Sequence, residues 1–166
     1  MNTIQRLLRH LTFPSFHARR LFPDDTLQEI ETTIATGEKQ HGAEIRVIIE
    51  KALSIPDILN RKTPRTRALE LFGLHRIWET EENNGILVYI NLADHKVEIV
   101  TDRGISEKIG SEQWKTVCEA MTRHFVDKHY REGVIEALNQ MNALLKVNFP
   151  PDSGRINALP DSPLLL

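Results

Sequence analysis

Polar side chains stand at both outer ends of an apolar hairpin in the stretch ENNGILVYINLADHKVEIVTDRG, residues 82–104. Asn83 and Asn84 precede the first apolar run, and Asp102 and Arg103 follow the second. Carboxylate and amide oxygens of this kind are ligands that calcium and magnesium prefer, and an arginine side chain can hold a phosphate or a carboxylate. The two ends of the hairpin therefore carry the first candidates for chemistry.

The order and direction of the predicted strands bring further polar residues to the same end of the hairpin. Antiparallel pairing across the turn NLADH sets Gly85 beside Asp102. A strand predicted within residues 44–50 reaches the hairpin through a helix, and such a crossover makes two parallel strands whose first residues share one edge. We call this edge the acidic rim. Its predicted members are His41, Glu44, Glu82, Asn83, Asn84, Asp102 and Arg103.

Three kinds of chemistry are open to the acidic rim, beside a purely structural role. Asp102, Glu44 and Asn84 form a candidate site for calcium or magnesium. Two carboxylates could instead share general acid and base roles, or Arg103 could hold an anion. In the structural alternative, Arg46 or Arg103 pairs with Glu44 or Asp102, and the asparagines only turn the chain. Residue chemistry leaves these alternatives open.

Histidine and cysteine give weaker signals. Glu38 and His41 stand three residues apart at a predicted helix end, so the pair either lines a pocket or makes a helix-end contact. Cys118 lies on the apolar stripe of a predicted helix, which favours a small buried hydrophobic residue over a nucleophile. The sequence contains no nucleotide-binding glycine loop, no nucleophile elbow and no zinc-protease motif.

Local patterns predict the elements of the first half of the chain. A capping box at Thr26 and Glu29 predicts a helix that begins near Leu27. Alternation of apolar and charged residues over 45–49 predicts a half-buried strand. A threonine followed by a proline predicts a helix over residues 64–75.

The second half completes the layers. Residues 86–90 are apolar on both faces, which predicts a central strand, and residues 96–101 return as its hairpin partner. Ser111 is a predicted cap for a long helix, and a last helix ends before Phe149. This order predicts an α/β protein, a three-layer α/β/α sandwich with a small mixed β-sheet flanked by helices.

We expect three segments along the chain: a basic amphipathic segment at 1–22, the α/β domain at 23–150, and a proline-rich tail at 151–166 that is extended or disordered. The first segment carries arginines, no acid, and apolar residues at helical spacing. It is predicted to be a helix packed on its own domain or, in the alternative, a partner-binding or membrane-surface arm. Its arginines are Arg6, Arg9, Arg19 and Arg20.

Composition narrows the class further. A formal net charge of -2 gives no general attraction to nucleic acid, and no aromatic platform is interleaved with basic residues in the domain. The single cysteine excludes an internal disulfide. The N-terminus lacks the apolar core of a secretory signal, and no stretch approaches the length of a membrane span. We expect a cytoplasmic protein, with peripheral association at the inner face of the membrane as an extension.

Several motifs in this order resemble the TPM domain family. They are HGAEIRVIIE at 41–50, WETEENNGILVYINLADHKVEIVTDRGI at 78–105, Trp114, and NFP at 148–150, with EKQH at 38–41. The likeness covers residues 18–150 and looks closest to a short bacterial branch without a signal peptide or membrane anchor. The resemblance implies a compact α/β/α sandwich.

The resemblance also implies possible roles. Acid phosphatase activity and calcium binding have been proposed for relatives, and their acidic pocket would map to Asp102, with Asn84 and Glu44 nearest. Genes of bacterial members often neighbour those of a LemA-type membrane protein, which implies a partner at the membrane. A shared fold does not transfer a reaction. We therefore expect a non-catalytic interaction module that assists a membrane-associated complex, with the acidic rim as a cation site.

The alternative is a metal-dependent hydrolase of the acid-phosphatase kind. In that hypothesis a cation held by Asp102 polarises a phosphoryl oxygen, and Glu44 or His41 handles a proton.

Overall fold

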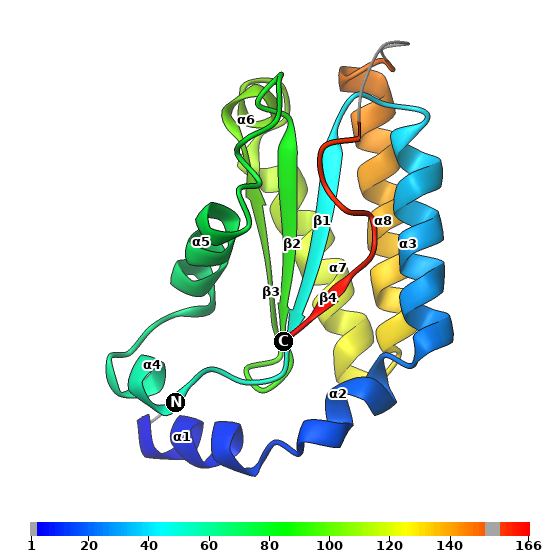
Figure 1. The fold of residues 1–166 in the computed structure, drawn as a ribbon. Coiled ribbons are helices and arrows are strands. Elements are labelled where there is room, and N and C mark those ends of the chain that lie inside the picture. Colours follow the sequence, from blue (N-terminus) through cyan, green and yellow to red (C-terminus); the bar gives the residue numbers. More distant parts are fainter. Residues whose placement is uncertain (1–2, 152–156) are drawn as a thin grey trace.

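A four-stranded mixed sheet forms the centre of the computed structural model, which describes residues 3–151 and 157–166. The strand order is β3-β2-β1-β4. Strand β1 (Glu44–Glu50) runs parallel to both β2 (Gly85–Asn91) and β4 (Leu164–Leu165), and β2 is antiparallel to β3 (Lys96–Thr101). The sheet is therefore mixed, with β3 at one edge and β4 at the other (Figure 1).

Helices cover both faces of this sheet, so the predicted three-layer α/β/α sandwich is confirmed (Figure 1). On one face lie α3 (Asp24–Glu38), α7 (Ser111–Val126) and α8 (Tyr130–Asn148). On the other lies α5 (Pro64–Leu74). Helices thereby shield both faces of the sheet from water.

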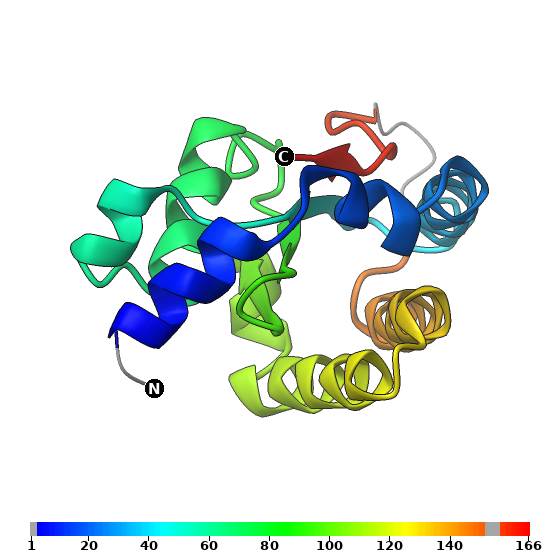
Figure 2. The same ribbon diagram turned by 90° about the horizontal axis from the view of Figure 1, so that it is seen from below.

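Four shorter helices complete the described chain: α1 (Thr3–Thr12), α2 (Ser15–Leu21), α4 (Ile55–Leu59) and α6 (Arg103–Lys108). Seen from below, α1 and α2 run across one end of the molecule, with α1 beside α4 (Figure 2). Across the described residues, every helix is too short or too polar to cross a membrane.

Alternation along the strands divides the core into two parts. Ile45, Val47 and Ile49 of β1 face the layer of three helices. Ile48 and Tyr89 face α5. All seven residues of β1 are buried, so the prediction of a half-buried strand was wrong. The reason is tertiary, because α5 and the end of the chain cover the face on which the charged residues of β1 stand.

The predicted register of the hairpin is confirmed. Ile86 pairs with Thr101, and Asn91 pairs with Lys96. The Asp102 N–H donates to the Gly85 carbonyl oxygen at 2.9 Å. The residues before β2 and after β3 therefore lie side by side, as the turn between the strands predicts.

Helix starts were predicted less well. Helix α3 begins at Asp24 behind Pro23, so the capping box at Thr26 was wrong by three residues. The Thr26 N–H donates instead to Asp25 Oδ1 at 2.6 Å. Helix α7 has Gly110 rather than Ser111 at its N-cap position. In α5 the predicted cap is confirmed, because Thr63 Oγ1 accepts from the Thr66 N–H at 3.0 Å.

Helices α4 and α6 and strand β4 had no sequence prediction. Helix α6 follows Asp102 directly, and Asp102 is its N-cap residue. Strand β4 lies in the proline-rich tail, where Leu164 and Leu165 pair with Ile48 and Ile49 of β1. Leu159 of the same tail is buried in the core on the α5 side. The described end of the tail is thus extended and packed against the domain.

Candidate functional site

The acidic rim exists as a meeting point of three chain segments. Glu44 pairs with Gly85 across the parallel strands, and its N–H donates to the Asn84 carbonyl oxygen at 3.1 Å. Asp102 joins Gly85 from the other side through the hairpin bond given above. Only glycine fits between them, because a Cβ on Gly85 would lie 2.0 Å from the Ile77 carbonyl oxygen. The three predicted metal-site residues are therefore neighbours around one glycine.

Each of these three side chains makes a contact that supports the fold. Glu44 is buried, and its Oε2 accepts from the Leu159 N–H at 2.9 Å. Asp102 caps α6, because its Oδ1 accepts from the Arg103 N–H at 2.7 Å. The Asn84 side-chain amide donates to the Gly42 carbonyl oxygen. A structural role is thus present at every predicted ligand.

Two oxygens of the rim have no hydrogen-bond partner among the described residues. They are Asp102 Oδ2 and Asn84 Oδ1, and both are buried. An unsatisfied buried acceptor costs about 1–3 kcal/mol, and oxygen acceptors of this kind suit a hard cation. The described part of the chain holds no group of three His, Cys, Asp or Glu side chains suited to a metal. Calcium or magnesium fits here only with amide and backbone oxygens completing the ligand set.

The helix-end pair predicted as a pocket holds the loop between α3 and β1. Glu38 Oε1 accepts from the Ile45 N–H at 2.8 Å. His41 is fully buried, with its Nε2 3.0 Å from Asn142 Oδ1 and its Nδ1 accepting from the Ala43 N–H at 3.3 Å. Both ring nitrogens of His41 already face partners within the protein.

The other predicted pocket residues fasten the loop before β2 to α6. Asn83 has a positive φ of 53°, which asparagine tolerates well. Its Oδ1 accepts from Arg103 Nη2 at 3.3 Å, and its carbonyl oxygen accepts from the Gly104 N–H at 3.0 Å. Gly104 must be glycine, since a Cβ there would lie 2.6 Å from the Glu82 carbonyl oxygen. The Glu82 side chain is exposed beside this loop.

Arg46 does not form the carboxylate pair of the structural alternative. Its Nη1 donates to the Pro160 carbonyl oxygen at 3.0 Å and to the Ser162 carbonyl oxygen. Together with Glu44, it fastens the tail that leads to β4. The charges of β1 thus bind backbone groups of the chain's own end.

The arginines of the N-terminal segment divide into two pairs. Arg6 Nη2 lies 2.6 Å from Asp94 Oδ2, and Arg9 Nη2 lies 2.7 Å from Asp94 Oδ1. His10 Nε2 lies 3.0 Å from the same carboxylate. We call this group the Asp94 clamp. Arg19 and Arg20 are exposed on α2 and are the members of the predicted partner or membrane surface that face outward.

The Asp94 clamp reverses the usual orientation of a surface helix. Because Arg6, Arg9 and His10 face inward, most apolar residues of α1 face outward, and Leu7 is half-buried. Exposure is 63% for Ile4, 56% for Leu8, 55% for Leu11 and 67% for Phe16 at the start of α2. We call these four residues the N-terminal apolar stripe. A contiguous exposed apolar patch often marks a docking surface.

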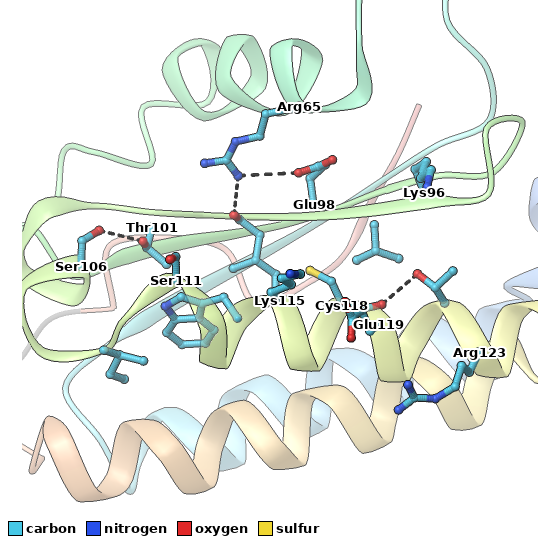
Figure 3. A pocket seen from close by; sticks show the side chains of 15 residues that line it. Arg65, Lys96, Glu98, Thr101, Ser106, Ser111, Lys115, Cys118, Glu119 and Arg123 are labelled. Carbon is cyan, nitrogen blue, oxygen red and sulfur yellow. Dashed lines mark hydrogen bonds and ion pairs between the residues drawn. The ribbon is translucent and has the colours of Figure 1, made fainter. Parts of the chain in front are cut away.

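A further site, absent from the sequence analysis, is a groove along the outer edge of β3. It has a volume of about 1020 Å³ and lies between β3, α5 and α7 (Figure 3). We call it the β3 groove. Its charged lining consists of Arg65, Lys96, Glu98, Lys115, Glu119 and Arg123. No local motif marks it, because its walls come from three elements far apart in the sequence.

The backbone of β3 is open toward this groove. Since Asp102 bonds to Gly85, hydrogen bonds to β2 fall at every second residue, namely 96, 98 and 100. The backbone groups of Val97, Ile99 and Thr101 therefore face away from β2. At Ile99 the carbonyl oxygen accepts from Arg65 Nη1 at 2.6 Å. A side chain thus occupies a position that a further strand would otherwise fill.

Positive charge exceeds negative charge in the β3 groove, with four cations and two acids in its lining. Arg65 Nη1 lies 3.7 Å from Glu98 Oε2, and Lys115 lies 3.9 Å from Glu112 on its own helix. Burial raises the pKa of Glu98, and Arg65 offsets part of that rise. Within the described residues, Lys96 and Arg123 form no ion pair.

The cysteine of the groove is not an activated nucleophile. Burial raises the pKa of Cys118 to about 12, and the Glu98 carboxylate adds to this rise against the effect of the Ile99 backbone. At neutral pH the thiol is therefore protonated, and the thiolate is the reactive form. The prediction that Cys118 packs as a small hydrophobic residue agrees with its contact to the core.

Comparison with known proteins places this fold in a family. The chain matches the model of the TPM domain over residues 16–144. It therefore belongs to the TPM domain family, as its motifs indicate. No curated protein matches the chain.

Solved structures share the architecture. The NMR structure of the BA42 protein from the psychrophilic bacterium Bizionia argentinensis has a TM-score of 0.75 and 25% identity, covering 86% of this chain and 93% of that one. The N-terminal domain of a P. gingivalis protein has a TM-score of 0.63 and 17% identity, covering 82% and 90%. The second likeness concerns the fold alone.

Proposed function

We propose that this TPM domain protein is a non-catalytic interaction module that docks on an anionic membrane surface through α1 and α2. The observation that supports the proposal is the orientation of α1, whose arginines face Asp94 while Ile4, Leu8 and Leu11 face outward. A surface helix of a globular protein normally turns its apolar stripe toward the core. Leaving that stripe in water is unfavourable unless another surface covers it.

The arrangement of charge favours a lipid surface as that cover. Ile4, Leu8 and Leu11 stand one above another on α1, and Phe16 extends the stripe onto α2. Arg19 and Arg20 are exposed on the same helix as Phe16. Apolar side chains that enter the headgroup region, with cations beside them, give the reversible binding typical of interfacial helices. Docking on this surface would bring the protein close to a LemA-type membrane protein, the partner that the family resemblance suggests.

Vesicle binding tests the proposal. The full chain is sedimented with vesicles of phosphatidylcholine, and with vesicles of phosphatidylcholine and phosphatidylserine in equal parts. We expect binding to the anionic vesicles, and we expect Leu8→Gln with Leu11→Gln to lower the partition coefficient at least about tenfold. The matched control is Leu69→Gln with Leu74→Gln, since these leucines are also exposed, on α5, at 51% and 70%.

Three results would overturn membrane docking. The first is equal binding of the two double variants, and the second is no binding to either vesicle. The third is a concentration-dependent dimer in sedimentation velocity that Leu8→Gln with Leu11→Gln dissolves, because a second copy would then cover the N-terminal apolar stripe.

A second candidate function is favoured by the two unpartnered oxygens of the acidic rim, Asp102 Oδ2 and Asn84 Oδ1. The matching family is also named for phosphatase activity, which points the same way. A calcium or magnesium ion bound there would supply a Lewis acid for a phosphate ester. Asp102 and Asn84 would hold it, while Glu44 keeps its bond to the tail.

Cation titration and an ester assay separate the two candidates. A bound cation would shift the NMR signals of Asn84, Gly85 and Asp102, and hydrolysis would be lost in Asp102→Asn but kept in Asp127→Asn, at an exposed helix end. The leading proposal predicts no difference in rate between these two variants.

The raised pKa of Cys118, about 12, gives a separate prediction. Alkylation of this thiol by iodoacetamide at pH 8 should be about a thousandfold slower than that of a free cysteine, because little thiolate is present.

A further inference from the structure

We propose that the β3 groove binds an extended acidic segment of a partner protein, which adds to the sheet as a new strand beside β3. This inference is independent of membrane docking, because the groove and the N-terminal apolar stripe share no residue.

Backbone geometry supports an extended ligand. The N–H and carbonyl groups of Val97 and Thr101 face the groove, and within the described residues no backbone group pairs with them. Outward-facing backbone groups at every second residue, 97, 99 and 101, match the hydrogen-bonding period of a strand. Recognition by strand addition uses such an edge for affinity and side-chain contacts for specificity.

Arg65 acts as a temporary partner at the middle of this edge. Its guanidinium donates to the Ile99 carbonyl oxygen, which is the position that an incoming backbone N–H would take. The Arg65 side chain is 50% exposed, so it can leave this position without unpacking the core. Once displaced, it adds a cation beside the bound segment.

Charge selects an acidic segment. Lys96 at the start of β3 and Arg123 on α7 form no ion pair in the part of the chain that the structure describes, and both line the groove (Figure 3). Side chains of an added strand alternate between the α5 side and the α7 side. Acidic residues at every second position therefore meet a cation whichever side they face, Arg65 on the α5 side or Lys115 and Arg123 on the α7 side.

The opposite edge of the same sheet supplies a precedent. There the chain's own end pairs with β1 as β4, and an arginine, Arg46, donates to the carbonyl oxygens that lead into it. An extended segment beside this sheet, held by backbone bonds and an arginine, is therefore an arrangement that the molecule already uses.

A synthetic peptide tests the inference. The probe is an acetylated and amidated hexapeptide of alternating glutamate and valine, and the control peptide replaces each glutamate with lysine. We expect the full chain to bind the acidic peptide at least about tenfold more tightly at low salt. Amide hydrogen exchange at Val97 and Thr101 should slow at least about tenfold at saturation, as expected when an open edge becomes paired.

Charge-reversal variants locate the site. Lys96→Glu with Arg123→Glu should lower the affinity for the acidic peptide at least about tenfold. The matched control, Lys39→Glu with Lys146→Glu, makes the same change of charge on exposed positions of the α3–α8 side and should leave it within about twofold.

Each contrary result is decisive. No binding of the acidic peptide, or equal binding of the lysine peptide, overturns the inference. Binding without slower hydrogen exchange at Val97 and Thr101 would show an anion site and not an added strand. Equal slowing of exchange at these two residues by tripolyphosphate would show the same. None of these results alters vesicle binding, so this inference and membrane docking fail separately.

Discussion

The two edges of the sheet end in opposite ways. At the β1 edge, the chain's own end pairs with the strand: the Leu166 N–H donates to the Ile49 carbonyl oxygen at 2.8 Å, and the Lys51 N–H donates to the Leu166 carbonyl oxygen at 3.1 Å. At the β3 edge, backbone groups face a groove with excess positive charge. An open strand edge invites pairing with other chains, and proteins normally protect it. The contrast identifies the β3 edge as the one left available for a partner.

The closed edge also explains why charged residues of β1 are poor evidence for chemistry. Glu44 and Arg46 bind backbone groups of Leu159, Pro160 and Ser162. Glu50 binds Arg67 Nη2 at 2.7 Å at the other end of the strand. Buried charges on this strand are satisfied within the protein, as buried charges must be.

Removal of residues 157–166 should have the largest effect, because it turns the closed β1 edge into a second open edge. The deletion exposes the β1 edge, leaves Glu44 and Arg46 without the tail, and removes the buried Leu159. We expect the free energy of unfolding to fall by about 4 kcal/mol, and we expect concentration-dependent self-association through the open edge. Urea unfolding and sedimentation velocity would measure the two effects.

Leu159→Ala is the control for that deletion, because it keeps the strand and removes only apolar contact. It should cost about 2–3 kcal/mol without self-association. If the deletion variant unfolds at the same urea concentration as the full chain, the β1 edge needs no cover. The two edges would then not differ in their need for a partner strand.

The hairpin is the part of this picture that the sequence predicts well. Its register follows from the polar turn at 91–95 and from the apolar runs on either side, since both are local patterns. The meeting of Glu44, Asn84 and Asp102 follows in turn, because a helical crossover fixes the direction of β1. Strand wiring can thus be inferred even where the chemistry of the residues it brings together cannot.

Other features depend on contacts that no local pattern records. Strand β4 is held through backbone groups, so its side chains carry little signal. The spacing of α1 separates a charged face from an apolar one, but only the position of Asp94 decides which face turns inward. The β3 groove needs walls from α5 and α7, and the order of elements does not give the space between them.

Asp94→Ala should have the next largest effect, and it concerns the open edge, since Asp94 stands in the turn that leads into β3. Only 5% of the Asp94 side chain is exposed, and its loss leaves Arg6, Arg9 and His10 facing one another. We expect a loss of about 3 kcal/mol, the cost of removing one member of a buried charged group. The exposed Asp24→Ala, whose side chain is 93% exposed, should change stability by less than about 0.5 kcal/mol. Equal urea midpoints for the two variants would contradict the clamp.

The same clamp predicts a pH dependence. Burial alone raises the pKa of Asp94, but hydrogen bonds from His10 and Arg6 outweigh it and hold that pKa well below its ordinary value. An unfolded aspartate titrates near pH 4, at about 3.9. The clamp therefore stabilises the fold above about pH 4, and its contribution is lost as the pH falls through the range below. Urea midpoints of wild type and Asp94→Asn should differ at pH 6 and converge toward pH 2, whereas a constant difference would exclude ionised Asp94 as the cause.

Thr101→Pro should give the smallest effect on stability, and comparison with a proline at the neighbouring Val100 tests whether the edge of β3 is open. Thr101 points its N–H away from β2, so Thr101→Pro removes no bond of the sheet and should cost less than about 1 kcal/mol. Val100 points its N–H toward Leu87, so Val100→Pro should cost about 3 kcal/mol or more.

Peptide binding tests the same position. Thr101→Val keeps the N–H and should bind the acidic peptide like wild type, while Thr101→Pro should bind it about fivefold more weakly, the value of one hydrogen bond. If both prolines destabilise equally, Thr101 is not free to pair outward. If Thr101→Pro binds the peptide as tightly as Thr101→Val, the edge of β3 is open but is not where the segment pairs.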